Sequence, residues 1–150
     1  MLSDERYSRQ IRFSPIGAEG QRRISGSRIA LIGAGALGTV SAELLARAGA
    51  GFIRIVDRDF VEASNLQRQS LYVEDDVRRN LPKSEAAAAK LRRINSGIQI
   101  ESIVDDVNPS NVEDYIQDVD LVLDALDNFE TRFVLNDACA KHSRAWIYAA

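Results

Sequence analysis

The stretch "RIALIGAGALG", residues 28–38, determines the fold class of this chain. An apolar run of strand length leads directly into three glycines, Gly33, Gly35 and Gly38, in the spacing G-x-G-x-x-G. Glycines in this spacing let the chain turn tightly from a strand into a helix and approach phosphate groups at the positive helix end. The stretch predicts a nucleotide-binding turn; the alternative is that the glycines serve only close helix–sheet packing.

Further strand-like runs follow, with helical patterns between them. This alternation predicts an α/β fold with a Rossmann-like, mostly parallel sheet and helices on both faces. The further runs expected to form strands are "GFIRIVD" (51–57), "IQIESIV" (98–104), "DLVLDAL" (120–126) and "RAWIYA" (144–149).

Glycine, proline and acidic residues mark the expected helix ends, because proline is favoured at a first helical position and glycine just beyond the last. Two short helices are expected before the first strand, outside the sheet. The expected helices cover 3–13, 16–24, 37–48 ending at Gly49, 82–95 opened by Pro82, 109–118 opened by Pro109, and 127–142 with Asp127 as the acidic N-cap candidate.

The chain is therefore expected to contain an N-terminal helical segment, 1–27, and a Rossmann-like nucleotide-binding domain, 28–150. A strand in such a sheet is normally covered by the helix that follows it, but none follows the strand at 144–149. We therefore expect that the domain continues in a longer chain, or that a partner covers this face.

Composition favours one folded domain and excludes several function classes. Hydrophobic residues make up 45% of the 150 residues and charged residues 27%, as in globular proteins. The net charge of −3 and the short basic cluster "QRRISGSR" (21–28), expected to be solvated, give no reason to expect nucleic acid as a partner. The single cysteine excludes an internal disulfide, and no signal peptide or membrane-spanning run is present, so a cytoplasmic location is expected.

Polar residues gather after the second predicted strand. Asp57 ends that strand, 19 positions after Gly38, close to the spacing at which an acidic side chain meets ribose hydroxyls; the alternative is a turn aspartate. Parallel strands end at one rim, where ligands bind, and the segment "DALDN" (124–128) should share that rim. The connection 58–81 is long for this fold and carries a polar group, which predicts a lid or a site there: Asn65, Gln67, Arg68 and Gln69.

Lys83 and Asp127 each have two interpretations. Lys83 lies in a first helical turn, where the helix dipole disfavours a cation, so we expect a compensating anion; alternatively it points into water or pairs with Glu74 or Glu85. Asp127 either caps a helix, in a capping box with Glu130, or holds Mg²⁺ at the sheet rim.

The number of cationic side chains favours a nucleoside triphosphate over a dinucleotide. A dinucleotide oxidoreductase needs little cationic charge beyond the backbone amides around its pyrophosphate. A triphosphate that loses pyrophosphate needs more, which Arg68, Lys83 and a metal ion could provide while Asn65 orients phosphate or ribose oxygens.

The motifs "RYSRQI", "GAGALG", "VDRDFVEASNLQRQSLY", "PKSEAA" and "DLVLDALDNFETR" resemble the adenylating domain of the MoeB, ThiF and HesA proteins, relatives of ubiquitin-activating enzymes. The resemblance covers nearly the whole chain. It implies ATP-dependent adenylation of the C-terminal carboxylate of a small ubiquitin-like or sulfur-carrier protein, in a pathway of the thiamine or molybdenum-cofactor type. It also implies a homodimer, because the family arginine that Arg9 matches reaches the other subunit's triphosphate.

The resemblance implies a role for each matched residue. Asp57 would bind the ribose, and Asp127, followed by Asn128, would bind Mg²⁺. The glycine turn of residues 33–38 would surround the nucleotide. The residues implied at the phosphates are Asn65, Arg68 and Lys83, with Arg9 supplied by a second copy, and Gln69 is expected to bind the nucleotide as well.

The chain also departs from the family. Many members carry later cysteines, one that accepts the carrier and two Cys-x-x-Cys pairs that bind structural zinc, so zinc is expected only in a longer chain. The single cysteine, Cys139, matches neither role and is expected to be a buried thiol. His142 is expected to be a helix-end residue without a catalytic role.

Two other functions use some of the same residues. An NAD-dependent oxidoreductase would use the glycines and Asp57 but would leave Arg68 and Lys83 unexplained. A non-catalytic nucleotide-binding or dimerisation module would bind ATP without exchanging pyrophosphate.

Overall fold

Five parallel strands form a single sheet in the computed structural model, which describes residues 5–149. The strand order is β3-β2-β1-β4-β5, so the chain winds outward in both directions from a central strand. This confirms the predicted Rossmann-like α/β class. The strands are β1 (Arg28–Ile32), β2 (Phe52–Val56), β3 (Gln99–Ile103), β4 (Leu121–Asp124) and β5 (Ala145–Tyr148).

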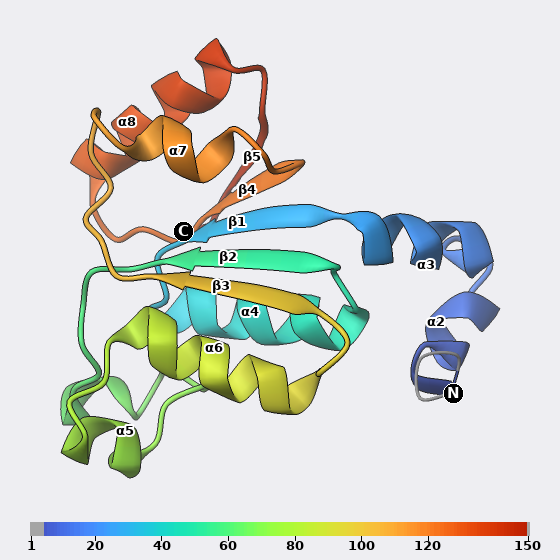
Figure 1. The fold of residues 1–150 in the computed structure, drawn as a ribbon, viewed down its shortest axis with the longest axis horizontal. Helices are drawn as coiled ribbons and strands as arrows, with labels where there is room; N and C mark the ends of the chain where they lie inside the picture. The colour runs from blue at the N-terminus through green and yellow to red at the C-terminus, as the bar shows by residue number, and fades with distance from the viewer. Residues whose placement is uncertain (1–4, 150) are drawn as a thin grey trace.

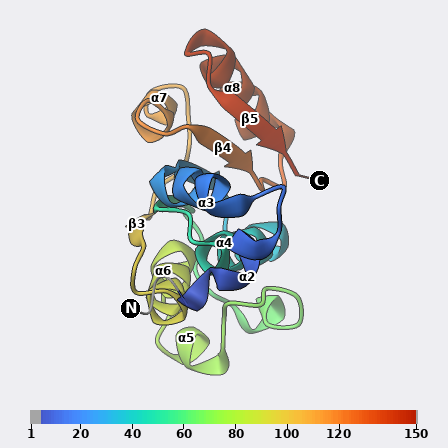
Figure 2. The same cartoon turned by 90° about the vertical axis from the view of Figure 1, so that its right-hand side faces the viewer.

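Helices cover both faces of the sheet, with α4 and α6 on one side and α7 and α8 on the other (Figure 1). The two N-terminal helices, α2 and α3, lie beyond the amino ends of the strands and face the viewer in Figure 2. No helix within residues 5–149 is long and apolar enough to cross a bilayer. The helices are α2 (Ser8–Arg12), α3 (Gly17–Gly26), α4 (Ala36–Ala48), the short 3-10 helix η1 (Ala63–Asn65), α5 (Glu74–Arg78), α6 (Lys83–Ile94), α7 (Val112–Ile116) and α8 (Phe129–Lys141).

Alternating side chains of β1 build two hydrophobic cores. Ile29 and Leu31 pack with α4 and α6, whereas Ala30 and Ile32 pack with α7 and α8. Successive side chains of a strand point to opposite faces, so a strand covered on both sides must be apolar throughout. The run "RIALI" meets this need and places the glycine turn at the carboxyl edge of the sheet.

The helix boundaries follow most of the predicted signals. Gly49 ends α4 with a left-handed φ of 89°, which glycine adopts without strain. Helix α7 starts at Val112 behind Asn111 and not at Pro109, so the proline prediction was wrong there. The connection 58–81 contains η1 and α5, which the sequence patterns did not indicate.

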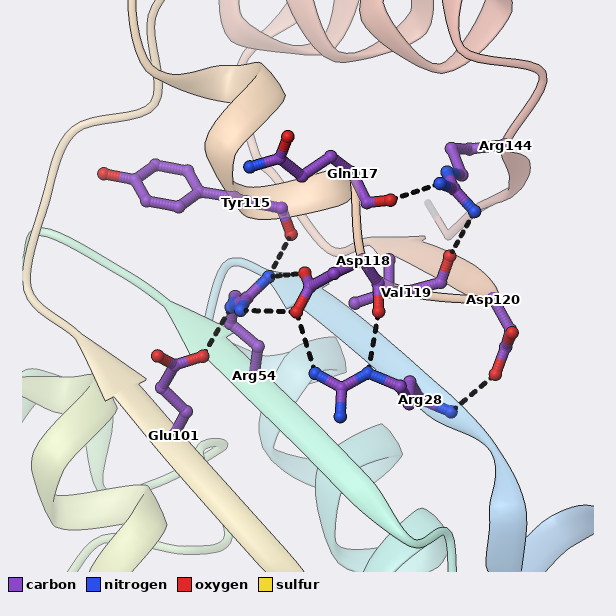
Figure 3. A network of polar contacts seen from close by, with 9 residues as sticks. All are labelled: Arg28, Arg54, Glu101, Tyr115, Gln117, Asp118, Val119, Asp120 and Arg144. Atoms are coloured by element: carbon purple, nitrogen blue, oxygen red, sulfur yellow. Dashed lines mark hydrogen bonds and ion pairs between the residues drawn. The ribbon is translucent and has the colours of Figure 1, made fainter.

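A polar network holds the loop between α7 and β4 against the sheet (Figure 3). Arg54 of β2 is buried and donates to Glu101 at 2.6 Å and to Asp118 at 2.5 Å. Asp118 also accepts a hydrogen bond of 2.8 Å from Arg28, so one carboxylate joins β1 and β2 to this loop. Strong hydrogen bonds between charged groups offset the cost of burying a guanidinium inside a sheet.

The last strand is covered on one face. Trp146 is half-buried on the α8 side, whereas Ala145 and Ile147 face the α4 side and are exposed, Ile147 by 51%. This exposure agrees with the expectation for a strand that no helix follows within the described residues.

Candidate functional site

A pocket of about 550 Å³ lies at the carboxyl edge of the sheet, where the loops after all five strands meet. Parallel α/β sheets bind ligands at this edge. The pocket unites most of the residues that the sequence singled out, whereas Arg9, Gly38, Asn65 and Gln69 do not line it. The predicted site residues that line it are Gly33, Gly35, Asp57, Arg68, Lys83, Asp127 and Asn128.

The three glycines of the turn have different roles. Gly33 has φ +97°, and a Cβ there would lie 2.7 Å from the carbonyl oxygen of Ala125; a Cβ on Gly38 would collide with the carbonyl of Gly33. These two glycines permit close packing. At Gly35 the nearest atom is Nε2 of Gln69, at 4.0 Å, so protein packing does not require a glycine. Its missing side chain leaves room at the amino end of α4, where backbone N–H groups attract anions.

Asp57 is held rigidly beside this turn. Its carboxylate accepts hydrogen bonds of 2.7 Å from the backbone N–H of Ala34 and of Asp59. Burial raises the pKa of Asp57, while the two hydrogen bonds act in the opposite direction. An ionised carboxylate has about four acceptor sites, so Asp57 retains capacity for ribose hydroxyls.

Lys83 begins α6 and its side chain is buried, with 9% of its surface exposed. Its ammonium group pairs with Asp59, at 2.9 Å, and not with Glu74 or Glu85. The expected compensating anion is therefore present, but it comes from the loop after β2. Because this pair lines the pocket, Lys83 can present its charge to a bound anion.

The remaining polar residues of the connection 58–81 lie at different depths. Arg68 is exposed, lines the pocket and donates only to the carbonyl of Ser64, at 3.0 Å. Asn65 is buried, and its Oδ1 accepts from the backbone of Glu62 at 3.0 Å, which shapes η1. Gln69 is buried, its Nε2 would lie 4.0 Å from a Cβ on Gly35, and its Oε1 has no hydrogen-bond partner within residues 5–149.

The contacts of the loop after β4 distinguish between the two interpretations of Asp127. Asn128, and not Asp127, caps α8, because its side chain accepts from the backbone of Thr131 at 2.9 Å. The capping interpretation of Asp127 was therefore wrong. Its exposed carboxylate lines the pocket and makes no hydrogen bond or ion pair within residues 5–149.

The pocket offers one free carboxylate for Mg²⁺. Within residues 5–149, no three acidic, histidine or cysteine side chains converge to hold a metal ion. Mg²⁺ commonly binds through one or two carboxylates, water and substrate phosphates, so this donor set fits an ion that arrives with a nucleotide. Asp127 is the side chain that would hold it.

The lining side chains include four cations, three of which are already paired. Arg58 pairs with Asp106 at 2.9 Å, Lys83 with Asp59, and Arg132 with Asp124 at 2.9 Å. Arg68 is the one lining cation without a carboxylate partner in the part of the chain that the structure describes. Three of the four lining cations therefore already share their charge with a carboxylate, whereas Arg68 does not within residues 5–149.

Sequence patterns missed several residues that shape the pocket. Asp124 is fully buried, and its carboxylate accepts from Arg132 and from the backbone of Leu126, which fixes the loop that carries Asp127. Tyr72 is buried, and its hydroxyl lies 2.7 Å from the carbonyl of Ala34 and 3.2 Å from that of Lys83. Asp59 and Arg132 also line the pocket. Their short distance in sequence from Asp57 and Asn128, two and four positions, could have indicated that they lie at the same edge of the sheet.

Three residues lie away from the pocket. Arg9 is exposed on α2, at the opposite end of the sheet. Cys139 is buried in α8, as predicted, and burial raises the pKa of its thiol to about 11. His142 ends α8, as predicted, with its Nε2 2.9 Å from Glu113 on α7.

The strand order, the glycine turn and the pocket at the carboxyl edge define a Rossmann-like α/β domain. The model of the ThiF family matches residues 7–150, and the chain belongs to this family.

Named relatives agree with this assignment. The chain is 52% identical over 145 residues to the sulfur carrier protein ThiS adenylyltransferase of Bacillus subtilis (strain 168), covering 97% of this chain and 43% of that protein. It is 45% identical over 135 residues to the SAMP-activating enzyme E1 of Haloferax volcanii, covering 90% and 49%. It therefore spans less than half the length of these two curated relatives.

Solved structures show the same fold. The E. coli tRNA N6-threonylcarbamoyladenosine dehydratase TcdA in complex with ATP superposes with a TM-score of 0.90 at 29% identity. The alignment covers 97% of this chain and 58% of TcdA. An E. coli MccB structure with AMPCPP and MccA reaches 0.86 at 28% identity, covering 97% and 44%.

Proposed function

We propose that this chain is the nucleotide-binding part of an ATP-dependent adenylyltransferase that activates the C-terminal carboxylate of a small ubiquitin-like sulfur carrier. The observation that carries the proposal is the pocket in which Gly35, Asp57, Arg68, Lys83 and Asp127 meet. The names of the relatives, which include adenylyltransferases for ThiS and an activating enzyme for SAMP, support the same reaction class.

In the proposed reaction, a carboxylate oxygen of the carrier attacks the α-phosphorus of ATP, and the bond to the β-phosphate breaks to release pyrophosphate. The carboxylate is already ionised at neutral pH, so no general base is needed. Catalysis would rest on positioning and on neutralising the charge that builds up on the leaving group. Arg68 and Lys83, which both line the pocket, would supply the positive charge.

The other pocket residues would position the nucleotide. Asp57, fixed by two backbone N–H groups, would accept from the ribose hydroxyls. The amino end of α4 would receive a phosphate beside Gly35. Asp127 would hold Mg²⁺, which would offset negative charge on the triphosphate when bound.

A second copy of the chain would complete the site. Arg9 lies on α2, remote from the pocket of its own chain, so it could reach a triphosphate only in another subunit. Within residues 5–149, one lining cation lacks a carboxylate partner, which supports the need for an additional arginine. We therefore include a homodimer in the proposal.

ATP–pyrophosphate exchange tests this function. The chain, mixed with a ubiquitin-like sulfur carrier and Mg²⁺, is expected to incorporate labelled pyrophosphate into ATP only while the carrier's terminal carboxylate is free. A carrier with an amidated C-terminus is the control. Exchange that persists with the amidated carrier would contradict the proposal. ATP binding without any exchange, even in a longer chain that contains these residues, would contradict it too and favour a non-catalytic nucleotide-binding module.

A further inference from the structure

Asp59 is in contact with the one buried lysine of the pocket. Its Oδ2 lies 2.9 Å from Nζ of Lys83, and the pair lies at the surface of the cavity. We infer that Asp59 is a placeholder anion, which neutralises Lys83 in the empty pocket and is displaced by a phosphate group of the nucleotide. This inference rests on the proposed function.

The two partners of the pair differ sharply in burial. The side chain of Lys83 is 9% exposed and that of Asp59 is 56% exposed. A buried ammonium group needs a counter-ion, because desolvation makes an unpaired charge costly. An exposed carboxylate loses little when it turns into water. The exchange therefore moves the carboxylate outward and leaves the ammonium group in place.

The backbone around the pair is fixed, so the exchange involves side chains alone. The N–H of Lys83 donates to the carbonyl of Asp59 at 2.8 Å, and the N–H of Asp59 donates to the carboxylate of Asp57 at 2.7 Å. A bridge between Phe60 and Pro82 continues this contact. Lys83 therefore keeps its position whether its partner is a carboxylate or a phosphate.

Asp59 is thus a positioning residue that competes with the ligand. If Asp59 supported the bound state, neutralising it would weaken the binding of pyrophosphate. If Asp59 competes with the ligand, neutralising it strengthens that binding. Asp59→Asn is expected to bind inorganic pyrophosphate without Mg²⁺ more tightly than the wild type, by roughly threefold or more, because the displaced ion pair no longer opposes binding. The same variant is expected to melt at a lower temperature when the pocket is empty.

Titration calorimetry with pyrophosphate in EDTA tests this, in a double-mutant cycle with Lys83→Gln. If Asp59 acts through Lys83, Asp59→Asn changes the affinity only where Lys83 is present. Asp106→Asn removes the same charge from the pocket but leaves Arg58, whose side chain is 63% exposed, with Asp59 as a remaining ion-pair partner at 3.8 Å, so a smaller gain is expected. Equal gains in Asp59→Asn and Asp106→Asn, or a gain that persists in Lys83→Gln, would overturn the inference.

A second measurement does not depend on the stability of a variant. In a structure of the wild type with pyrophosphate, Nζ of Lys83 is expected to contact a phosphate oxygen and to have left Asp59. A Lys83–Asp59 pair that stays intact in this structure would reject the placeholder role. In a separate titration, a weaker affinity of Asp59→Asn for Mg²⁺-pyrophosphate would mark Asp59 as a metal ligand and would also reject it. If the wild type binds neither ATP nor pyrophosphate, the proposed function itself fails.

Discussion

At the residue scale, adjacent side chains in the loop after β4 have separate tasks. Asn128 caps α8, and Asp127 faces the pocket with a free carboxylate. An N-cap side chain contributes about 1 kcal/mol to helix stability, whereas an exposed, unpaired carboxylate contributes little. Stability and metal binding can therefore be assigned to different residues of the same loop.

The pair Asp127→Ala and Asn128→Ala separates the two tasks. Asp127→Ala is expected to leave the melting temperature within about 1 °C of the wild type and to raise the Mg²⁺ concentration needed for ATP binding. Asn128→Ala is expected to lower the melting temperature by roughly 2–4 °C. Thermal melts and ATP titrations at several Mg²⁺ concentrations measure both. An unchanged Mg²⁺ requirement in Asp127→Ala would contradict its role.

Arg68 is the second residue with a distinct expected effect. Its guanidinium is exposed, and within residues 5–149 it donates a hydrogen bond only to the carbonyl of Ser64. Loss of this side chain therefore costs little stability. Arg68→Ala is expected to weaken ATP binding roughly tenfold or more, because a hydrogen bond between charged groups is lost. Arg22→Ala, which removes an exposed arginine of α3, is the control. Equal ATP affinity in both variants would remove Arg68 from the phosphate site.

At the scale of elements, the turn between β1 and α4 combines packing with binding. Gly33→Ala is expected to destabilise the fold by roughly 2 kcal/mol or more, because φ is +97° and the new Cβ would press on the carbonyl of Ala125. Gly35→Ala is expected to leave the fold intact, because the new Cβ has only Nε2 of Gln69 within 4.0 Å, and to weaken ATP binding, because Gly35 lines the pocket. Melting curves and ATP titrations of both variants test this; normal ATP affinity in Gly35→Ala would argue against a phosphate beside that residue.

The network around Arg54 predicts how stability depends on pH. The hydrogen bond from Arg54 lowers the pKa of Asp118 to about 2. An aspartate whose folded pKa is depressed contributes stability above its unfolded pKa of about 3.9, and this contribution is lost as the pH falls to about 2.

Asp118→Asn is therefore expected to be less stable than the wild type at pH 7, by about 1–2 kcal/mol, a value discounted because the carboxylate is partly exposed to solvent. The difference should shrink between pH 4 and pH 2, roughly the span of the two pKa values. Asp114→Asn, whose carboxylate makes no ion pair within residues 5–149, is the control. Urea melts across this range measure the effect; a difference that stays constant with pH would contradict the assignment.

At the scale of the whole molecule, the sequence predicted the sheet well. Apolar runs of strand length, separated by helical patterns, marked the positions of all five strands, although β2 and β3 include charged residues and β5 is covered on one face only. The meeting of residues 33–37, 57–59 and 125–129 at one edge followed from the rules of parallel α/β folds, whereas the strand order comes from the structure.

Partners of charged residues were harder to predict, because they depend on contacts between distant segments. Asp59 lies 24 positions before Lys83, and Asp118 lies 64 positions after Arg54. Local spacing led instead to Glu74 or Glu85 for Lys83, and to Asp127 as the helix cap. The sequence patterns did not indicate η1 and α5 in the connection 58–81, because each is too short to show a hydrophobic period.

The central claim is that the pocket binds a nucleoside triphosphate and not a dinucleotide. The most direct test is calorimetric titration of the chain with ATP and Mg²⁺ and, separately, with NAD⁺. We expect saturable binding of ATP, which NAD⁺ at equal concentration neither reproduces nor displaces. Saturable binding of NAD⁺ in the absence of ATP binding would contradict the account and favour an oxidoreductase.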